Sequence, residues 1–122
     1  MIDRYSRKKM KAIWDEENKF SIWLKIELAA AEAMEKLKII PRGVVKKVKS
    51  KGKINVKRIL EIEKSVKHDV IAFLTSITEK AGKEARYLHK GMTSSDVLDT
   101  CFNLQLKQSG EILLKDIDIL LK

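Results

Sequence analysis

A sustained helical period in the apolar residues is the feature that most restricts the fold of this chain. Apolar side chains recur every three to four positions at Phe20, Trp23, Leu24, Leu28, Ala31, Met34 and Leu37. This spacing places them on one face of an α-helix. Asp15 precedes the run as an N-cap, and Glu16 and Glu17 fall in the first turn, where the helix dipole favours negative charge. A long core helix is therefore predicted.

Shorter helices are expected on both sides of it. A first helix is expected to start near Ser6. Pro41 suits the first turn of a third helix, because its fixed φ matches helical geometry, and Gly52 is expected to end that helix. Asn55 is expected to cap a fourth helix, in which apolar residues keep the helical phase through Val66.

The longest helix is expected at the end of the chain. Asp69 is expected to cap a helix that stops at Gly82, and residues 83–92 are expected to form a loop. Thr93-Ser94-Ser95-Asp96 has the form of a capping box. Helical spacing then continues through Leu98, Cys101, Phe102, Gln105, Leu106, Ser109, Leu113, Ile117 and Leu120. This helix reaches Lys122 in phase and without a stop signal, so we expect a fragment of a longer helical protein.

The same patterns define the fold class. The chain of 122 residues fits a single domain, and no alternating strand pattern is present in it. With one proline, five glycines and 44% apolar residues, its composition is neither disordered nor rich in tight turns. An all-α fold is predicted.

Lysine supplies most of the excess positive charge, which is +9 overall. A charge of this sign attracts anions in general, whether nucleic acid, anionic membrane or a multiply charged metabolite. The lysines are densest at Lys46, Lys47, Lys49, Lys51 and Lys53. Aromatic residues do not alternate with them, as they would on a surface that stacks the bases of a single strand. We interpret this stretch as a solvated basic hairpin, with a basic nucleic-acid-binding module as the alternative.

The single cysteine and the N-terminal sequence indicate a cytoplasmic protein. Cys101 has no partner for an internal disulfide, and it lies at an apolar position of the last predicted helix, so we expect it to be buried. The first five residues contain no apolar signal-peptide core. The most apolar stretch, residues 26–34, is interrupted by Glu27 and Glu32 and is too short to span a bilayer.

Three groups of polar residues, at separate places in the sequence, are candidates for binding an anion. Arg4 and Tyr5 offer a guanidinium fork and a phenol, both of which donate to phosphate oxygens. Lys67, His68 and Asp69 lie at a predicted helix junction. There Asp69 is either a cap or a ligand contact, and His68 is either its neighbour or a proton carrier.

The third group lies at the start of the last predicted helix. The hydroxyls of Thr93, Ser94 and Ser95 either cap the helix or, with its unpaired N–H groups, bind a carboxylate or a phosphate. Gly91 allows the backbone to approach a ligand closely. His89 either faces the same site or lies exposed on the loop.

Other site chemistries are not expected. The chain has two histidines and one cysteine. A metal site on a helix needs ligands three or four residues apart, and neither histidine has another ligand at that spacing. The chain has no Gly-rich phosphate loop and no dinucleotide fingerprint. The predicted burial of Cys101 argues against a nucleophilic role.

Taken in order, three blocks of sequence resemble the N-terminal domain of the adenylosuccinate lyases, a family of the fumarase/aspartase superfamily. The blocks are Arg4-Tyr5, the sequence HDVIAF from His68 to Phe73, and the sequence HKGMTSSDVLDT from His89 to Thr100. The last block is typical of the whole superfamily, and the first two distinguish this family within it. Family members usually carry Arg in place of Lys67, whose ammonium lacks the bidentate fork.

The resemblance implies an enzyme that eliminates fumarate from adenylosuccinate, giving AMP, and from succinyl-aminoimidazole-carboxamide ribotide in purine synthesis. The reaction abstracts a proton and then breaks a C–N bond, and it needs no cofactor. By the same resemblance Arg4 and Tyr5 hold the phosphate and Thr93 and Ser94 bind the succinyl carboxylates. The remaining substrate-binding residues it implies are Lys67, His68 (also an auxiliary proton donor), Asp69 and His89.

The resemblance also implies a division of the chain and a larger assembly. Residues 1–93 form the helical N-terminal domain, and residues 94–122 start the long helix that leads into a central helical bundle. The main catalytic histidine and serine come from later sequence, and each site combines residues of three subunits of a homotetramer. This chain is therefore expected to be inactive alone, to bind a small nucleotide, and to contact neither nucleic acid nor membrane.

A different lyase of the superfamily, or a carboxymuconate cycloisomerase, is the alternative within the resemblance. These proteins share the Thr-Ser-Ser-Asp-like block but not the early Arg-Tyr pair.

Overall fold

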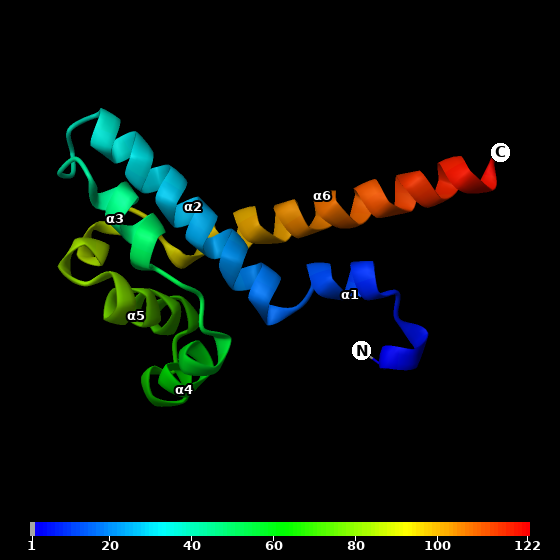
Figure 1. Cartoon of the computed structure of the whole chain (residues 1–122), viewed down its shortest axis with the longest axis horizontal. Coiled ribbons are helices and arrows are strands. Elements are labelled where there is room, and N and C mark those ends of the chain that lie inside the picture. The colour runs from blue at the N-terminus through cyan, green and yellow to red at the C-terminus, as the bar shows by residue number, and fades with distance from the viewer. Residues whose placement is uncertain (1) are drawn as a thin grey trace.

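Helices supply all the regular structure of residues 2–122, the part of the chain that the computed structural model describes. In chain order they are the 3-10 helix η1 (Asp3–Tyr5), α1 (Lys8–Ile13), α2 (Glu16–Lys36), α3 (Val44–Lys51), α4 (Val56–Val66), α5 (Asp69–Ala81), the 3-10 helix η2 (Lys83–Tyr87) and α6 (Ser94–Leu120). The predicted all-α fold is confirmed. Figure 1 shows α2 crossing the molecule, with α3, α4 and α5 on one side and α1 and the far half of α6 on the other.

The central helix α2 begins where the sequence predicts. The Asp15 carboxylate accepts a hydrogen bond from the Asn18 N–H at 2.8 Å, which satisfies a donor that the first turn leaves unpaired. Four of the seven residues predicted on its apolar face are buried, namely Phe20, Trp23, Leu28 and Ala31, and Leu24 and Met34 pack against the core. Leu37 is 70% exposed, contrary to prediction, because α2 ends at Lys36.

Three aromatic rings join α2 to α5. Phe20 and Phe73 stack with their centroids 6.0 Å apart, and Trp23 meets both rings edge-on, at 5.2 Å from Phe20 and 5.5 Å from Phe73. All three side chains are almost completely buried. Offset-stacked and edge-on arrangements are the ones that aromatic quadrupoles favour. This cluster fixes the start of α5 relative to α2.

The basic stretch is part of a helix, so its interpretation as a hairpin was wrong. Val44, Val45 and Val48 of α3 are buried, which holds the helix against the core. The lysines of the stretch are all exposed, as expected: Lys46, Lys47, Lys49, Lys51 and Lys53. The valines lie on one face of α3 and the lysines on the other, and burial of the valines stabilises the helix despite the mutual repulsion of the lysines.

Local differences from the prediction concern helix ends. Pro41 precedes α3 and does not lie in its first turn, because Gly43, at φ 94°, is the N-cap. Gly52 ends α3 and Asn55 caps α4 through its side chain, as predicted. The first helix starts at Lys8, with Arg7 as its N-cap, close to the predicted Ser6, whose hydroxyl donates to the Ile2 carbonyl.

The start of α5 and the segment after it also differ. His68, and not Asp69, is the N-cap of α5, and Asp69 is the first helical residue. Gly82, at φ 80°, ends α5 as predicted. Residues 83–87 then form η2 where a loop was expected, since Ala85 is buried and draws this segment onto the core.

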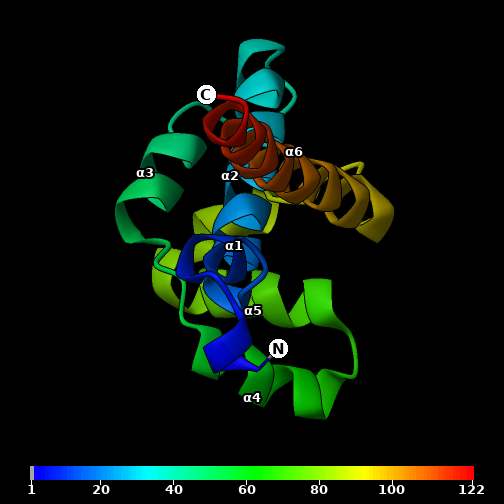
Figure 2. The ribbon, with the colours of Figure 1, turned by 90° about the vertical axis from the view of Figure 1, so that its right-hand side faces the viewer.

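The last helix, α6, buries a narrower face than predicted. Its capping box forms between Thr93 and Asp96. The buried positions are Val97, Cys101, Gln105 and Ser109, spaced every four residues. The apolar residues predicted on its buried face include five that are exposed: Phe102, Leu106, Leu113, Ile117 and Leu120. Phe102 and Leu106 lie beside the buried Cys101 and Gln105, on another face of the helix. Leu113, Ile117 and Leu120 lie on the half of α6 that extends beyond α2 in Figure 1 and is seen end-on in Figure 2.

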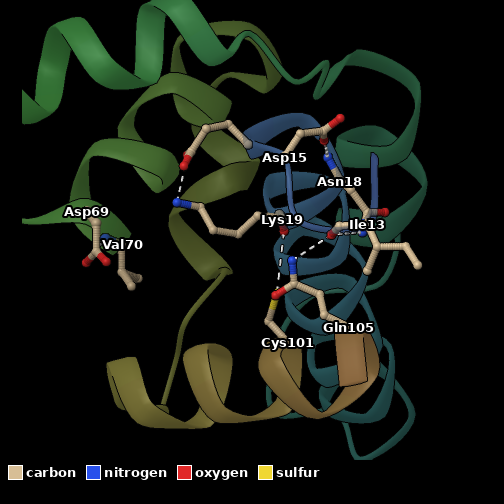
Figure 3. A network of polar contacts seen from close by, with 9 residues as sticks. Ile13, Asp15, Asn18, Lys19, Asp69, Val70, Cys101 and Gln105 are labelled. Carbon is tan, nitrogen blue, oxygen red and sulfur yellow. Dashed lines mark hydrogen bonds and ion pairs between the residues drawn. The ribbon is translucent and has the colours of Figure 1, made fainter. Parts of the chain in front are cut away.

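Polar contacts join the buried face of α6 to the end of α1 and the start of α2 (Figure 3). The Gln105 amide donates to the Ile13 carbonyl at 2.8 Å, and the Cys101 thiol donates weakly to the Lys19 carbonyl at 3.8 Å. Cys101 is buried as predicted, and burial raises the pKa of its thiol. The division between residues 1–93 and 94–122 stays a prediction. Val97 and Cys101 of α6 belong to the same core as α2.

Candidate anion-binding site

The first candidate pair lies on η1 at the surface. Tyr5 is 74% exposed, and the Arg4 guanidinium lies over its ring, 4.8 Å from the ring centroid. A cation over an aromatic face orients both side chains without burying either. Both polar groups therefore remain accessible to a ligand.

The second group lies at the junction of α4 and α5, where the backbone turns sharply. Lys67 caps the end of α4 with a left-handed backbone, at φ 55°. The Asp69 carboxylate accepts the Val70 N–H at 2.7 Å, and Figure 3 shows these two residues at the start of α5. Lys67 also lines a shallow hollow of about 480 Å³ along α4.

The His68 ring has a defined hydrogen-bonding role in this junction. Its Nδ1 accepts the Ile71 N–H at 3.4 Å, so this nitrogen carries no proton in that arrangement. The Nε2 atom then carries the proton of the neutral ring and can donate it to a ligand. Asp69 Oδ1 lies 3.6 Å from Nδ1, which is beyond hydrogen-bonding distance.

The third group includes a histidine that is held by a buried carboxylate. Glu27, in the middle of α2, is completely buried. One of its oxygens accepts the His89 backbone N–H at 2.7 Å, and the other lies 2.7 Å from His89 Nδ1. The His89 side chain is 18% exposed. A carboxylate that receives two short hydrogen bonds from one residue fixes both the backbone and the ring of that residue.

Thr93 and Ser94 form the N-terminus of α6, close in sequence to His89. The Thr93 N–H donates to the Asp96 carboxylate at 2.8 Å within the capping box. Ser94 is the first helical residue and is partly buried. A turn from His89 to Met92, closed by a 3.4 Å backbone hydrogen bond, leads into this helix end. The structure thus places an imidazole and a hydroxyl-bearing helix N-terminus at the two ends of one short turn.

The structure brings the members of each group together but keeps the three groups on separate elements. Among residues 2–122, no hydrogen bond or ion pair joins η1, the α4–α5 junction and the α6 N-terminus to one another through their candidate residues. The three candidate groups therefore lie on separate elements of this chain.

Glu27 is the residue of this region that the sequence analysis did not identify as part of a site. In the sequence, Glu27 interrupts an apolar stretch. A charged residue one turn after a buried Trp23, on the apolar face of a core helix, was the available signal. Such a charge is seldom buried unless it is paired.

A basic hollow is lined by residues other than the candidates. Its volume is about 430 Å³, and its lining includes four cationic side chains, of Arg42, Lys47, Lys83 and Arg86. Lys47 is already paired with Glu84, which lowers the pKa of that carboxyl. Arg86 lies over the ring of Tyr87 and donates to its hydroxyl at 2.8 Å.

Residues 2–122 contain no cluster of three or more His, Cys, Asp or Glu side chains arranged to hold a metal ion. In the same residues, none of the helices combines the length and the apolar character needed to cross a membrane.

The fold is that of a fumarate lyase domain. A crystal structure of a fumarate lyase from Mesorhizobium sp. BNC1 superposes on this chain with a TM-score of 0.75. The superposition covers 88% of this chain and 26% of that protein, at 23% sequence identity. At this identity the similarity defines the fold alone.

Sequence comparison finds similarity to one kind of lyase. The chain is 47% identical over 118 residues to the adenylosuccinate lyase of Bacillus subtilis (strain 168) and 48% identical over 121 residues to that of Aquifex aeolicus (strain VF5). Each alignment covers 97% of this chain, so the resemblance found in the sequence blocks is confirmed. The chain spans only 27–28% of the length of these relatives. No protein-family model matches it.

Proposed function

We propose that this chain forms part of the substrate-binding machinery of an adenylosuccinate lyase, which eliminates fumarate from adenylosuccinate to give AMP. The observation that carries this proposal is the 47–48% identity to two adenylosuccinate lyases across almost the whole chain. The geometry agrees with it. The substrate carries a phosphate and two carboxylates, and the chain offers a guanidinium, imidazoles and a hydroxyl-bearing helix N-terminus.

We assign the residues to parts of the substrate as follows. Arg4 and Tyr5 hold the phosphate, since their polar groups are exposed and mutually oriented. Ser94 binds a succinyl carboxylate at the N-terminus of α6, together with Thr93. His89 lies beside them as a further donor.

The α4–α5 junction supplies the remaining contacts. His68 donates from Nε2 as an auxiliary proton donor, since its Nδ1 is occupied as the helix cap. Lys67 and Asp69 contact the substrate beside it. Lys67 supplies a point charge in place of the bidentate fork of an arginine.

The complete enzyme is proposed to be a cytoplasmic homotetramer in which each site combines residues of several subunits. The separation of the three groups on different elements supports this arrangement. The exposed apolar residues on the far half of α6, such as Leu113 and Ile117, suit helix–helix packing between subunits. The main proton-transfer groups are proposed to come from sequence outside this chain, so the chain alone should release no fumarate.

A chimeric enzyme tests the proposal. The segment of the Bacillus subtilis lyase that aligns with this chain is replaced by residues 1–122, and adenylosuccinate cleavage is followed by ultraviolet absorbance. We expect the chimera to cleave adenylosuccinate and the isolated chain to be inactive. A folded tetrameric chimera that cleaves argininosuccinate and not adenylosuccinate would overturn the proposal.

Two matched pairs of variants test the residue assignments within the chimera. Arg4→Ala should raise KM strongly with little change in folding, while Lys8→Ala, a control at a nearby exposed cation, should not. Ser94→Ala should impair turnover more than Ser95→Ala, because only Ser94 is assigned to a carboxylate. Unchanged kinetic constants for Arg4→Ala would refute the phosphate role.

A further inference from the structure

The buried pair of Glu27 and His89 has features that a simple loop contact does not need. Glu27 is completely buried, and a buried carboxylate is strongly unfavourable unless hydrogen bonds compensate it. Both compensating donors come from one residue, the backbone N–H and the ring of His89. Both polar contacts of the Glu27 carboxylate are thus made with a single loop histidine.

The backbone of His89 is itself in an unusual conformation. Its φ of 60° lies in the left-handed region, which costs a non-glycine residue on the order of 1 kcal/mol or more. The bonds to Glu27 hold the residue there. This conformation starts the turn that leads to Thr93, so the position of the ring relative to the α6 N-terminus is set by α2.

The chemistry of the pair determines which ring nitrogen is protonated. Nδ1 of His89 lies 2.7 Å from a Glu27 oxygen, and toward an ionised carboxylate, which only accepts hydrogen bonds, this nitrogen is the donor. The Nε2 atom is then the ring nitrogen left for a ligand. This is the opposite of His68, whose Nδ1 accepts a backbone N–H and whose Nε2 carries the proton.

We propose that Glu27 is a positioning residue that fixes the Nδ1–H tautomer of His89 and directs Nε2 to an anionic group bound at the α6 N-terminus. An anion at Nε2 needs a donor, so the ring takes up a second proton from solvent, at Nε2, when the anion binds. The buried Glu27 carboxylate then balances the charge of the imidazolium. The identity of the anion as part of a lyase substrate rests on the proposed function, whereas the tautomer does not.

Glu27→Gln separates this role from a purely structural one. The backbone N–H of His89 can only donate, so the amide oxygen of the substituted side chain must accept it, as a carboxylate oxygen of Glu27 does now. The amide nitrogen of the same side chain then faces Nδ1 and donates to it. Both hydrogen bonds and the shape of the side chain are kept, but the ring is forced into the Nε2–H tautomer and the buried charge is lost.

The tautomers are measured on this chain by two-bond ¹H–¹⁵N correlation NMR. The chain has only two histidines, so a His68→Gln variant assigns both rings. We expect a protonated Nδ1 in wild-type His89 and an unprotonated Nδ1 in the Glu27→Gln variant. His68 should keep an unprotonated Nδ1 in both proteins, which makes it an internal control. An unprotonated Nδ1 in wild-type His89, or a ring unaffected by Glu27→Gln, would overturn the proposal.

The chimeric lyase supplies the second measurement. In the Glu27→Gln variant the ring binds the anion as a neutral imidazole, because the amide that donates to Nδ1 excludes the second proton and carries no charge to balance an imidazolium. The kcat/KM should therefore fall by about tenfold or more, as it does when a metal-ligating histidine loses its carboxylate partner, without loss of the tetramer or its melting temperature. Unchanged kcat/KM with a switched tautomer would overturn the substrate role of the ring. An inactive wild-type chimera with the expected tautomers would instead defeat the proposed function and leave the positioning role intact.

Discussion

Truncation of Phe73 tests whether the three-ring cluster holds α5 on α2. Phe73 is completely buried between Phe20 and Trp23, with centroid distances of 6.0 and 5.5 Å. Replacing a buried Phe by Ala costs about 3–5 kcal/mol, from lost transfer free energy and from the cavity that remains. Phe73→Leu keeps most of the volume and loses two ring pairs of about 0.5–1.5 kcal/mol each, so it should cost about 1–3 kcal/mol.

Urea unfolding followed by far-ultraviolet circular dichroism measures these differences. Domains of this size are stable by about 5–15 kcal/mol, so Phe73→Ala should shift the midpoint strongly at an unchanged m-value. Phe102→Ala is the matched control. Phe102 is 52% exposed, and its ring centroid lies 6.0 Å from that of the partly exposed Trp14, so its truncation should cost under about 1 kcal/mol.

A double-mutant cycle of Phe20→Leu and Phe73→Leu isolates the contact between the stacked rings, with an expected coupling of about 0.5–1.5 kcal/mol. The reasoning is refuted if Phe73→Ala destabilises the chain no more than Phe102→Ala. In that case the aromatic cluster does not anchor α5, and the position of His68 at its start needs another explanation.

Three further outcomes are expected. Gly110→Ala should stabilise the chain by about 0.5–1 kcal/mol, since open space surrounds this helical position. Gly52→Ala should destabilise the chain, because a Cβ there would lie 2.7 Å from a backbone carbonyl oxygen. Thermal melts of the two variants measure both effects. Burial raises the pKa of the Cys101 thiol in the folded chain. The buried thiol therefore stabilises the fold fully below the ordinary thiol pKa, and this stabilisation is lost as the pH rises toward the thiol pKa of the folded chain. Thermal melts of Cys101→Ala should not show this loss. The hydrogen bond from Arg7 lowers the pKa of the Asp116 carboxyl in the folded chain. The stabilisation from this pair is present above the ordinary carboxyl pKa and disappears as the pH falls through the pKa of Asp116 in the folded chain. Arg7→Gln should raise the pKa of Asp116 in a carboxyl-detected NMR titration.

The helices were predictable because their signals are local. Asp15, Asn55 and the Thr93–Asp96 box each sit beside an apolar run of helical period, and each caps its helix as expected. Pro41 was misleading because a proline near a helix start is also common just outside it. The left-handed Gly43 decides the actual start of α3.

The extent of the buried face on α6 was not predictable in the same way. Periodicity identifies an apolar stripe, but which part of it is covered depends on where the neighbouring helix ends. The polar residue Gln105 is buried because it meets the Ile13 carbonyl, whereas Leu113 has no neighbour of that kind and is 54% exposed. Contacts over such a sequence separation leave no local signal.

The candidate site shows the same limit. The sequence blocks identified His89 as a candidate, but its partner Glu27 lies 62 residues earlier, on a different helix. Only the folded structure shows that this carboxylate is the reason the histidine has a fixed orientation. The cap role of His68 was missed for a related reason, since histidine is a rare N-cap and Asp69 beside it is a common one.

The position of Glu27 on α2 has a consequence for how this segment can change in length. Trp23 and Glu27 are four residues apart, so the aromatic cluster and the carboxylate share one helix face. One residue inserted between them would turn Glu27 by about 100° around the helix axis and shift it by about 1.5 Å along it. Either the rings or the carboxylate would lose their partners. Insertions and deletions should therefore be tolerated in the connection between α2 and α3 and excluded from this turn of α2.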